Sequence, residues 1–171
     1  MDDQELGHVL NVGDISLQDD PFLHELIGRN NIELINLFVE RFENIGELLE
    51  LTDIWGGNYP KDRAIISVLI ENGFDINKPN WTGRTFLHKC AEEDDVETAD
   101  VLLQFGANIE AIEAVYGETP LASAARCGKV KMVAFLKEKG ADISGDSNKP
   151  WTQPVIIAES KGHVEVIAAL K

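Results

Sequence analysis

The segment that decides the predicted fold is Gly117-Glu118-Thr119-Pro120-Leu121-Ala122-Ser123-Ala124-Ala125. Thr119 followed by Pro120 predicts the start of a helix, because the threonine hydroxyl can accept from free N–H groups and proline loses no hydrogen bond in a first turn. The alanines at the end of the segment are small, so a second helix can pack closely against this one. The segment therefore predicts a short helix that is paired with another helix.

The same features recur along the chain at a nearly constant spacing. Gly83-Arg84-Thr85-Phe86-Leu87-His88 repeats the pattern that begins at Gly117. Apolar helical segments end at Gly73, Gly106 and Gly140. In both sets the glycines are spaced by about 33 residues, and glycine commonly ends a helix because the backbone turns left-handed there. Features that recur in step predict tandem helical units and argue against a four-helix bundle.

These residues resemble the ankyrin repeat, whose signature is T-P-L-H-x-A within a period of about 33 residues. The match is strong over residues 63–171 and reaches residues 20–62 by extension. The resemblance implies an all-α solenoid of about five helix-turn-helix units linked by short β-hairpin loops, with the first two units irregular. We expect an acidic tail or cap at 1–19 and one ankyrin-repeat domain over 20–171, with approximate units 20–43, 44–78, 79–112, 113–146 and 147–171.

The net charge of −15 is concentrated in the first part of the chain. Residues 1–50 carry twelve acidic and two basic side chains, a net charge of −10, and residues 51–171 carry the remaining −5. This charge argues against nucleic-acid binding, because phosphate contacts need Lys and Arg, and it opposes contact with an anionic membrane. Either it attracts a basic surface on a partner protein, or it serves solubility alone.

The sequence also indicates a compartment. It holds no apolar run near the roughly 20 residues of a membrane helix, and its acidic N-terminus lacks the basic and apolar regions of a signal peptide. We therefore expect a cytoplasmic protein that makes no membrane contact. Cys90 and Cys127 stand outside any CxxC pair, so we expect neither a zinc site nor a disulfide.

The sequence contains no motif typical of catalysis or metal binding. The ankyrin resemblance implies that His24 and His88 hold adjacent repeats together and that His163 precedes an outer helix, while His8 has no visible partner. Glu92-Glu93-Asp94-Asp95 lacks the spacing of a calcium loop and predicts a solvated turn between helices. We expect no enzyme, no cofactor and no metal.

Ankyrin proteins usually meet their partners on the concave side, through loop tips and inner helices. Tryptophan and tyrosine often dominate binding energy, and Trp81, Tyr116 and Trp151 fall on the expected tips. Trp151, which stands where a hairpin glycine would be, is equally compatible with packing against a neighbouring loop. Carried over position by position, the resemblance implies partner-binding residues Trp81, Thr82, Arg84, Glu92, Glu93, Val115, Tyr116, Glu118, Arg126, Lys149 and Trp151, flanked by Cys127, Pro150, Thr152, Ser160 and Lys161.

The predicted function is a non-catalytic protein-interaction module, either an adaptor, a scaffold or a stoichiometric inhibitor, that is monomeric alone. The resemblance is closest in style to small stand-alone ankyrin proteins of bacteria or viruses. The alternative hypothesis is a small-ligand-binding or enzymatic pocket near the irregular second unit. The loop with Tyr59 in that unit is a further candidate contact.

Overall fold

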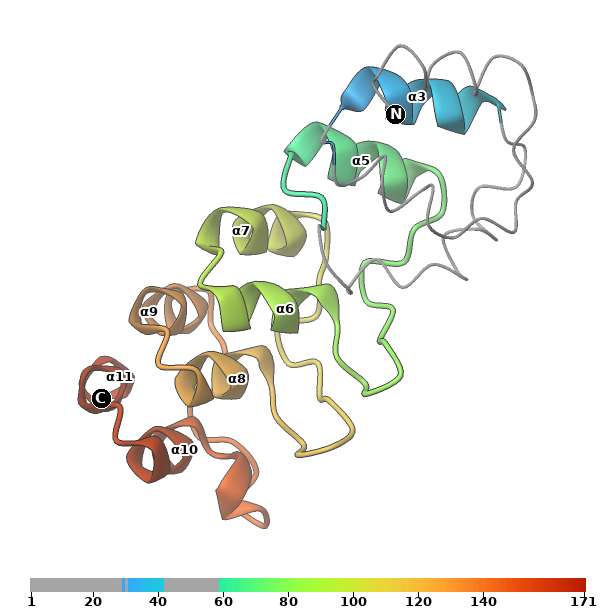
Figure 1. Ribbon diagram of the computed structural model, residues 1–171. Coiled ribbons are helices and arrows are strands. Elements are labelled where there is room, and N and C mark those ends of the chain that lie inside the picture. Colours follow the sequence, from blue (N-terminus) through green and yellow to red (C-terminus); the bar gives the residue numbers. More distant parts are fainter. Residues whose placement is uncertain (1–28, 30, 42–58) are drawn as a thin grey trace. The chain divides into compact units, whose positions relative to one another are not determined.

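The computed structural model describes residues 29, 31–41 and 59–171 (Figure 1). The chain divides into two compact units, residues 1–75 and 76–171, and each is described by itself. The predicted tail at 1–19 and the predicted first helices of both irregular units fall outside the described residues. The single domain over 20–171 therefore stays a prediction.

Residues 76–171 fold into three pairs of short helices (Figure 1). The first helices of the pairs, α6, α8 and α10, lie side by side, and the second helices, α7, α9 and α11, form a neighbouring row. The described residues contain no β-strand, and loops connect the pairs. This arrangement confirms the predicted all-α repeat fold. The helices are α6 (Phe86–Glu93), α7 (Val96–Gln104), α8 (Pro120–Arg126), α9 (Val130–Glu138), α10 (Pro154–Lys161) and α11 (Val164–Leu170), with a 3-10 helix η1 (Pro150–Thr152) before α10.

The predicted helix boundaries follow from capping. The side-chain oxygen of Thr119 accepts from the N–H of Ala122 at 3.2 Å, and Pro120 occupies the first turn of α8. Gly106 and Gly140 follow α7 and α9 with φ of +91° and +92°. Both predicted signals, the threonine-proline start and the glycine end, are therefore confirmed.

The acidic turn between α6 and α7 differs from the expectation of a purely solvated turn. Asp94 has a φ of +64° and is the one described non-glycine residue with positive φ. Its carboxylate accepts from the N–H of Met132 on α9 at 3.0 Å. Asp95 caps α7 by accepting from the N–H of Thr98 at 3.1 Å. The turn is built into the repeat stack because its two aspartates satisfy backbone donors.

Polar side chains also join successive loops of residues 76–171. The amide of Asn77 donates to the carbonyl of Gly106 at 3.1 Å, and its oxygen accepts from the N–H of Asn108 at 2.7 Å. One repeat later, the carboxylate of Glu110 accepts from the N–H of Asp142 at 2.7 Å. These links fix each loop against the next one.

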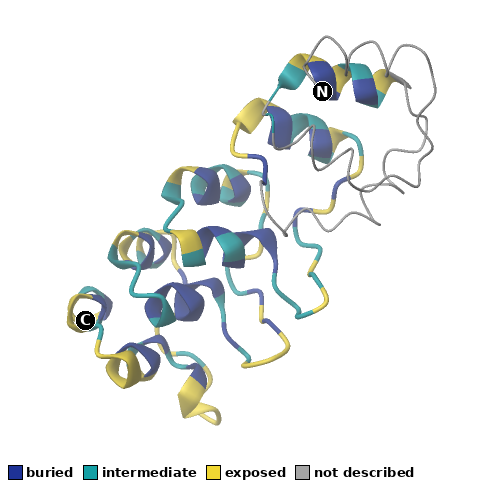
Figure 2. Cartoon of the chain, in the orientation of Figure 1, coloured by how far each residue is buried: buried dark blue, intermediate teal, exposed yellow. Residues whose placement is uncertain are grey.

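The core of residues 76–171 runs between the two rows of helices (Figure 2). Phe86 and Leu121 are buried there, each close to the start of the first helix of its unit. The predicted close approach of helices is confirmed, because the small residues on α6, α8 and α10 are fully buried: Ala91, Ala124, Ala125 and Ala158.

In residues 1–75, the structure describes α3 (Ile32–Arg41) and α5 (Arg63–Glu71), which pack against each other. The side chain of Asp62 caps α5 by accepting from the N–H of Ala64 at 2.7 Å. The helix α3 lies within residues 20–43, the first predicted helix-turn-helix unit. The buried side chains of this pair are Leu34, Ile35, Phe38, Ile65, Ile66 and Leu69.

Candidate functional site

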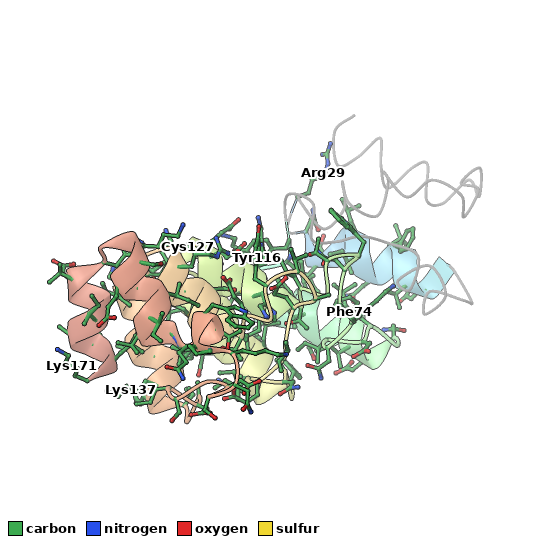
Figure 3. The ribbon with its side chains drawn as sticks, turned by 90° about the horizontal axis from the view of Figure 1, so that it is seen from below. Arg29, Phe74, Tyr116, Cys127, Lys137 and Lys171 are labelled. Carbon is green, nitrogen blue, oxygen red and sulfur yellow. The ribbon has the colours of Figure 1, made fainter. Side chains whose placement is uncertain are left out.

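Three connections precede the inner helices of residues 76–171, and they extend to the same side of the helix rows (Figure 1). We call residues 80–84 loop 1, residues 113–118 loop 2 and residues 143–153 loop 3. Large apolar side chains are exposed on all three: Trp81 by 89%, Val115 by 58%, Tyr116 by 61% and Trp151 by 63%. Figure 3 labels Tyr116 and Cys127 along one edge of this unit and Lys137, on an outer helix, along the opposite edge.

Loop 1 is held by one side chain, Asn80. Its side-chain oxygen accepts from the N–H of Thr82 at 3.0 Å, from the Thr82 hydroxyl at 2.7 Å and from the N–H of Arg84 at 3.0 Å. The N–H of Asn80 donates to the carbonyl of Arg84 at 2.8 Å. The tight turn leaves Trp81 at its tip.

Loop 2 is organised by Glu113, whose side chain is buried. Its carboxylate accepts from the N–H of Val115 at 2.8 Å, from the N–H of Tyr116 and from the N–H of Glu118 at 3.2 Å. Burial opposes ionisation, but these three N–H groups and the charge of Arg84 outweigh it and hold the pKa of Glu113 below its ordinary value. An ionised carboxylate that accepts several backbone hydrogen bonds is strongly stabilised.

Loops 1 and 2 touch through their backbones. The N–H of Ala114 donates to the carbonyl of Thr82 at 2.9 Å. Gly83 makes this approach possible, because a Cβ atom there would lie 2.5 Å from the backbone nitrogen of Ala114. Its φ of +82° also favours glycine. The two loops therefore form one continuous surface that carries Trp81 and Tyr116.

A charged network lies beneath this surface. Glu92 on α6 pairs with Arg84 at 2.6 Å and with Arg126 at 2.5 Å, and Arg126 also pairs with Glu118 at 2.9 Å. The Ser123 hydroxyl donates to Glu118 at 3.1 Å. Burial opposes the charge of Arg126, but its hydrogen bond and attraction to Glu118, with the hydrogen bond to Glu92, raise its pKa above the ordinary value. The network joins two successive repeats and fixes the residues at the ends of both loops.

His88 supports loop 2 from below. The N–H of Thr85 donates to its Nδ1 at 3.1 Å, so Nε2 carries the proton and donates to the carbonyl of Glu118 at 3.1 Å. Burial lowers the pKa of His88, although the bond to Glu118 acts in the opposite direction. His163 similarly contacts the carbonyl of Arg126 at 3.1 Å. The predicted structural role of both histidines is confirmed, while His8 and His24 lie outside the described residues.

Loop 3 is built differently from the other two loops. Trp151 sits on the 3-10 helix η1 rather than at a hairpin tip, which corrects its predicted position. Thr152 is buried, its hydroxyl donates to the carbonyl of Lys149 at 2.8 Å, and its methyl group lies beside Gly117. Asp146 is exposed and accepts from the N–H of Asn148 at 2.8 Å, a hydrogen bond within the loop itself.

The predicted contact residues divide by accessibility. Glu118 is buried beneath Arg126, so we remove it from the direct contacts and treat it as a support. Tyr59 is buried, with Lys61 over its ring, so its prediction as a contact is wrong. Partly exposed residues are Thr82, Arg84, Glu92, Arg126 and Cys127, and exposed residues are Trp81, Glu93, Val115, Tyr116, Lys149, Pro150, Trp151, Ser160 and Lys161.

Sequence reasoning missed Asn80 and Glu113, the two residues that shape loops 1 and 2. Asn80 stands three positions before Gly83, whereas Glu113 stands four positions before Gly117. A polar residue at the start of each predicted loop was the available signal. Its meaning depends on burial, which the repeat spacing does not reveal.

The described residues offer few features that could bind a metal ion or a small molecule. No group of three or more His, Cys, Asp or Glu side chains among them could hold a metal ion. An open pocket of about 270 Å³ lies beside Gly128, His163 and Val164, below the size common for small-molecule sites. In the described parts of the chain, none of the helices combines the length and the apolar character that are needed to span a bilayer.

Comparison with known families identifies the repeat. Residues 57–147 match the family described as ankyrin repeats (3 copies). The chain belongs to the ankyrin-repeat family, whose members are in general non-enzymatic protein-interaction modules. The last helix pair, α10 and α11, lies beyond the matched residues but stacks on α8 and α9 as a further unit.

Curated relatives share the repeats within longer proteins. The chain is 30% identical over 156 residues to Ankyrin repeat protein nuc-2 of Neurospora crassa, which is 88% of this chain and 14% of that protein. It is 30% identical over 114 residues to Ankyrin repeat and KH domain-containing protein mask-1 of Caenorhabditis elegans, which is 65% of this chain and 4% of that protein. It is 33% identical over 79 residues to Palmitoyltransferase Hip14 of Drosophila melanogaster, which is 46% of this chain and 12% of that protein. The chain thus spans a small part of each relative.

Proposed function

We propose that this protein binds another protein through the exposed side chains of loops 1, 2 and 3, as a non-catalytic adaptor, scaffold or stoichiometric inhibitor. The observation that carries the proposal is the high exposure of Trp81, Tyr116 and Trp151 on successive loops. Side chains of this kind dominate many protein interfaces, and exposed apolar groups that gather on one side mark interaction sites.

The polar residues near these aromatic side chains are also typical of a binding surface. Arg84 of loop 1 and its ion-paired neighbours Glu92 and Arg126 are partly exposed polar groups, and interfaces commonly have an apolar centre with a polar rim. The alternative pocket, near the second unit, falls largely among residues 42–58, outside the described residues. None of the described contacts favours it.

The test compares the double variant Trp81→Ala/Tyr116→Ala with Val164→Ala. Val164 is 74% exposed but lies on α11, so it is a matched control for loss of an exposed apolar side chain. A photo-crosslinking residue at position 81, 116 or 164 first identifies the bound protein in a native lysate. We expect the double variant to bind that protein at least about 30-fold more weakly and Val164→Ala to bind it normally. Equal binding by both variants contradicts the proposal.

The charge of the chain suggests the kind of surface that the partner offers. A net charge of −15 attracts a basic protein surface over a distance of about 10 Å at about 0.1 M salt. We expect the association rate to fall as salt rises from about 50 to about 500 mM, measured by stopped-flow mixing. An association rate that does not change with salt would mean that the charge serves solubility and does not attract the partner.

We also propose that the protein acts in the cytoplasm. Cys90 and Cys127 are not joined in a disulfide, and reduced cysteines are typical of that compartment. Imaging of a fluorescent fusion in the native cell tests this assignment, and a signal confined to a membrane or an organelle contradicts it.

A further inference from the structure

We infer that Glu113 is a positioning residue for partner binding: its buried carboxylate holds loop 2 against loop 1, so that Trp81, Val115 and Tyr116 form one preorganised contact surface. The inference rests on the proposed function, because it assigns a role in the same surface. It adds a residue that is hidden from the partner and acts through the residues that the partner meets.

The first argument is the match between loop length and side-chain length. In loop 1, Trp81 and Thr82 separate Asn80 from Gly83, and Asn80 spans the turn with a short side chain. Loop 2 has one more residue between Glu113 and Gly117, and Glu113 has one more methylene group with which to reach across it. The extra residue enlarges the exposed tip, and the longer acid keeps that larger tip ordered.

The second argument is where the carboxylate of Glu113 directs its hydrogen bonds. All three donors are backbone N–H groups of loop 2, from Val115, Tyr116 and Glu118. The following helix has its own cap, because Thr119 accepts from the N–H of Ala122. Glu113 is therefore not needed to start α8, and its effect falls on the loop that carries the exposed side chains.

The third argument is the link to loop 1. The N–H of Ala114, the residue after Glu113, donates to the carbonyl of Thr82 at 2.9 Å. Thr82 is fixed in turn by Asn80 through two hydrogen bonds. Fixing loop 2 thus fixes its position relative to Trp81.

Preorganisation raises affinity because the ordering of a loop is then complete before the partner arrives. Without the Glu113 carboxylate, Val115 and Tyr116 would have to be ordered on binding. We expect the dissociation constant to rise about tenfold, which is the usual scale for ordering two side chains and their loop. A partner that binds the ordered loops then meets Trp81 and Tyr116 already in place.

The experiment uses Glu113→Gln and Glu113→Ala in the full chain, with Asp146→Asn in loop 3 as the matched carboxylate control. Amide hydrogen exchange of the free protein reports loop order without a partner. Glutamine keeps the volume of the side chain but replaces one acceptor oxygen with an NH₂ group. We expect faster exchange at Val115, Tyr116 and Glu118 in both Glu113 variants, with the amides of α10 still protected as a check on folding.

The second measurement is the affinity for the protein that crosslinks at position 81 or 116. The inference is supported if both Glu113 variants bind it about tenfold more weakly while Asp146→Asn binds normally. Unchanged loop exchange, or unchanged affinity when Trp81→Ala/Tyr116→Ala abolishes binding, overturns the inference and leaves the proposed function standing. If the aromatic double variant also binds normally, both ideas fail.

Discussion

Loops 2 and 3 occupy the same place in successive repeats and both expose an aromatic residue, yet they are supported in different ways. In loop 2, the buried carboxylate of Glu113 accepts backbone hydrogen bonds, and His88 donates a hydrogen bond to the carbonyl of Glu118. Loop 3 has the exposed Asp146, which bonds within the loop, and it carries Trp151 on a 3-10 helix. The same repeat position can therefore present an aromatic side chain on a rigid or on a less supported loop.

The preceding unit explains part of this difference. His88 donates to the carbonyl of Glu118 in the next unit. One repeat later, the equivalent position is Ala122, which has no side-chain donor for loop 3. The support of a loop thus depends on a residue in the unit before it, and a substitution there changes a surface that it does not touch.

Among substitutions in the loops, the largest expected effect concerns the contact between loops 1 and 2. Gly83→Ala would put a Cβ atom 2.5 Å from the backbone of Ala114 at a φ of +82°, so we expect a loss of about 2–4 kcal/mol in the free energy of unfolding. Gly145→Ala in loop 3 would meet its nearest atom, on Gln153, at 3.1 Å, and about 1–2 kcal/mol is expected. Urea unfolding measures both. Equal losses would remove the contrast between the loops.

The next effect tests the two acids. Glu113→Ala removes three hydrogen bonds to a buried carboxylate and is expected to cost about 1–3 kcal/mol. Asp146→Ala, in loop 3, is expected to change the stability by less than about 0.5 kcal/mol. Chemical denaturation at neutral pH gives both values, and a costly Asp146→Ala would show that loop 3 is supported as firmly as loop 2.

A pH series isolates His88. Its pKa is lowered by burial, against the bond to Glu118, from an ordinary value of 6.5. The unfolded chain therefore binds a proton near pH 6.5 before the folded chain does, and the stability present above that pH is lost as the pH falls below it. We expect the urea midpoint to drop more between about pH 7.5 and about pH 5.5 in the wild type than in His88→Gln.

The other histidines are common to both proteins in this series, so the difference between the two curves belongs to His88. Keeping the pH at or above about 5.5 also limits the contribution of carboxylates such as Glu113, whose pKa lies below its ordinary value of 4.5. Parallel curves for the two proteins would mean that His88 is not the sensitive group.

The smallest expected effect is that of the exposed aromatic residues on folding. Trp81→Ala, Tyr116→Ala and Trp151→Ala should each change the free energy of unfolding by less than about 0.5 kcal/mol, whereas Phe86→Ala in the core should cost about 3–5 kcal/mol. Thermal and urea unfolding report these values. A loss above about 1 kcal/mol for Trp151→Ala would favour its alternative role, packing against a neighbouring loop.

The repeat fold was predictable because its signals are local and recur in step. Thr119 and Pro120 start a helix and Gly106 and Gly140 follow helices, as their backbone preferences require. The period of about 33 residues then indicated which segments lie side by side. The exposure of Trp81 and Tyr116 on the loops followed from the same register.

The supports of the surface were not predictable because they depend on burial and on contacts between units. Glu118 was predicted as a contact, but it is buried by Arg126, which also pairs with Glu92 of the preceding unit. Tyr59 stands in a segment rich in loop-forming residues, and its burial could not be inferred from them. Asp94 takes a backbone conformation that usually favours glycine, and it bonds to a neighbouring unit.

The side-chain links between repeats also determine how the protein should respond to force. Those described in residues 76–171 join positions about one repeat apart, from the link between Asn77 and Gly106 to the pair of Lys139 with Asp100. Each link therefore ties a repeat to its immediate neighbour, and repeat arrays are stabilised in this way by nearest-neighbour contacts. Under tension applied at the C-terminus, we expect α10 and α11 to unfold first, while the ion pairs of Glu92 with Arg84 and Arg126 still hold the two preceding repeats together. The aromatic surface of loops 1 and 2 would then stay folded after the last repeat has unfolded.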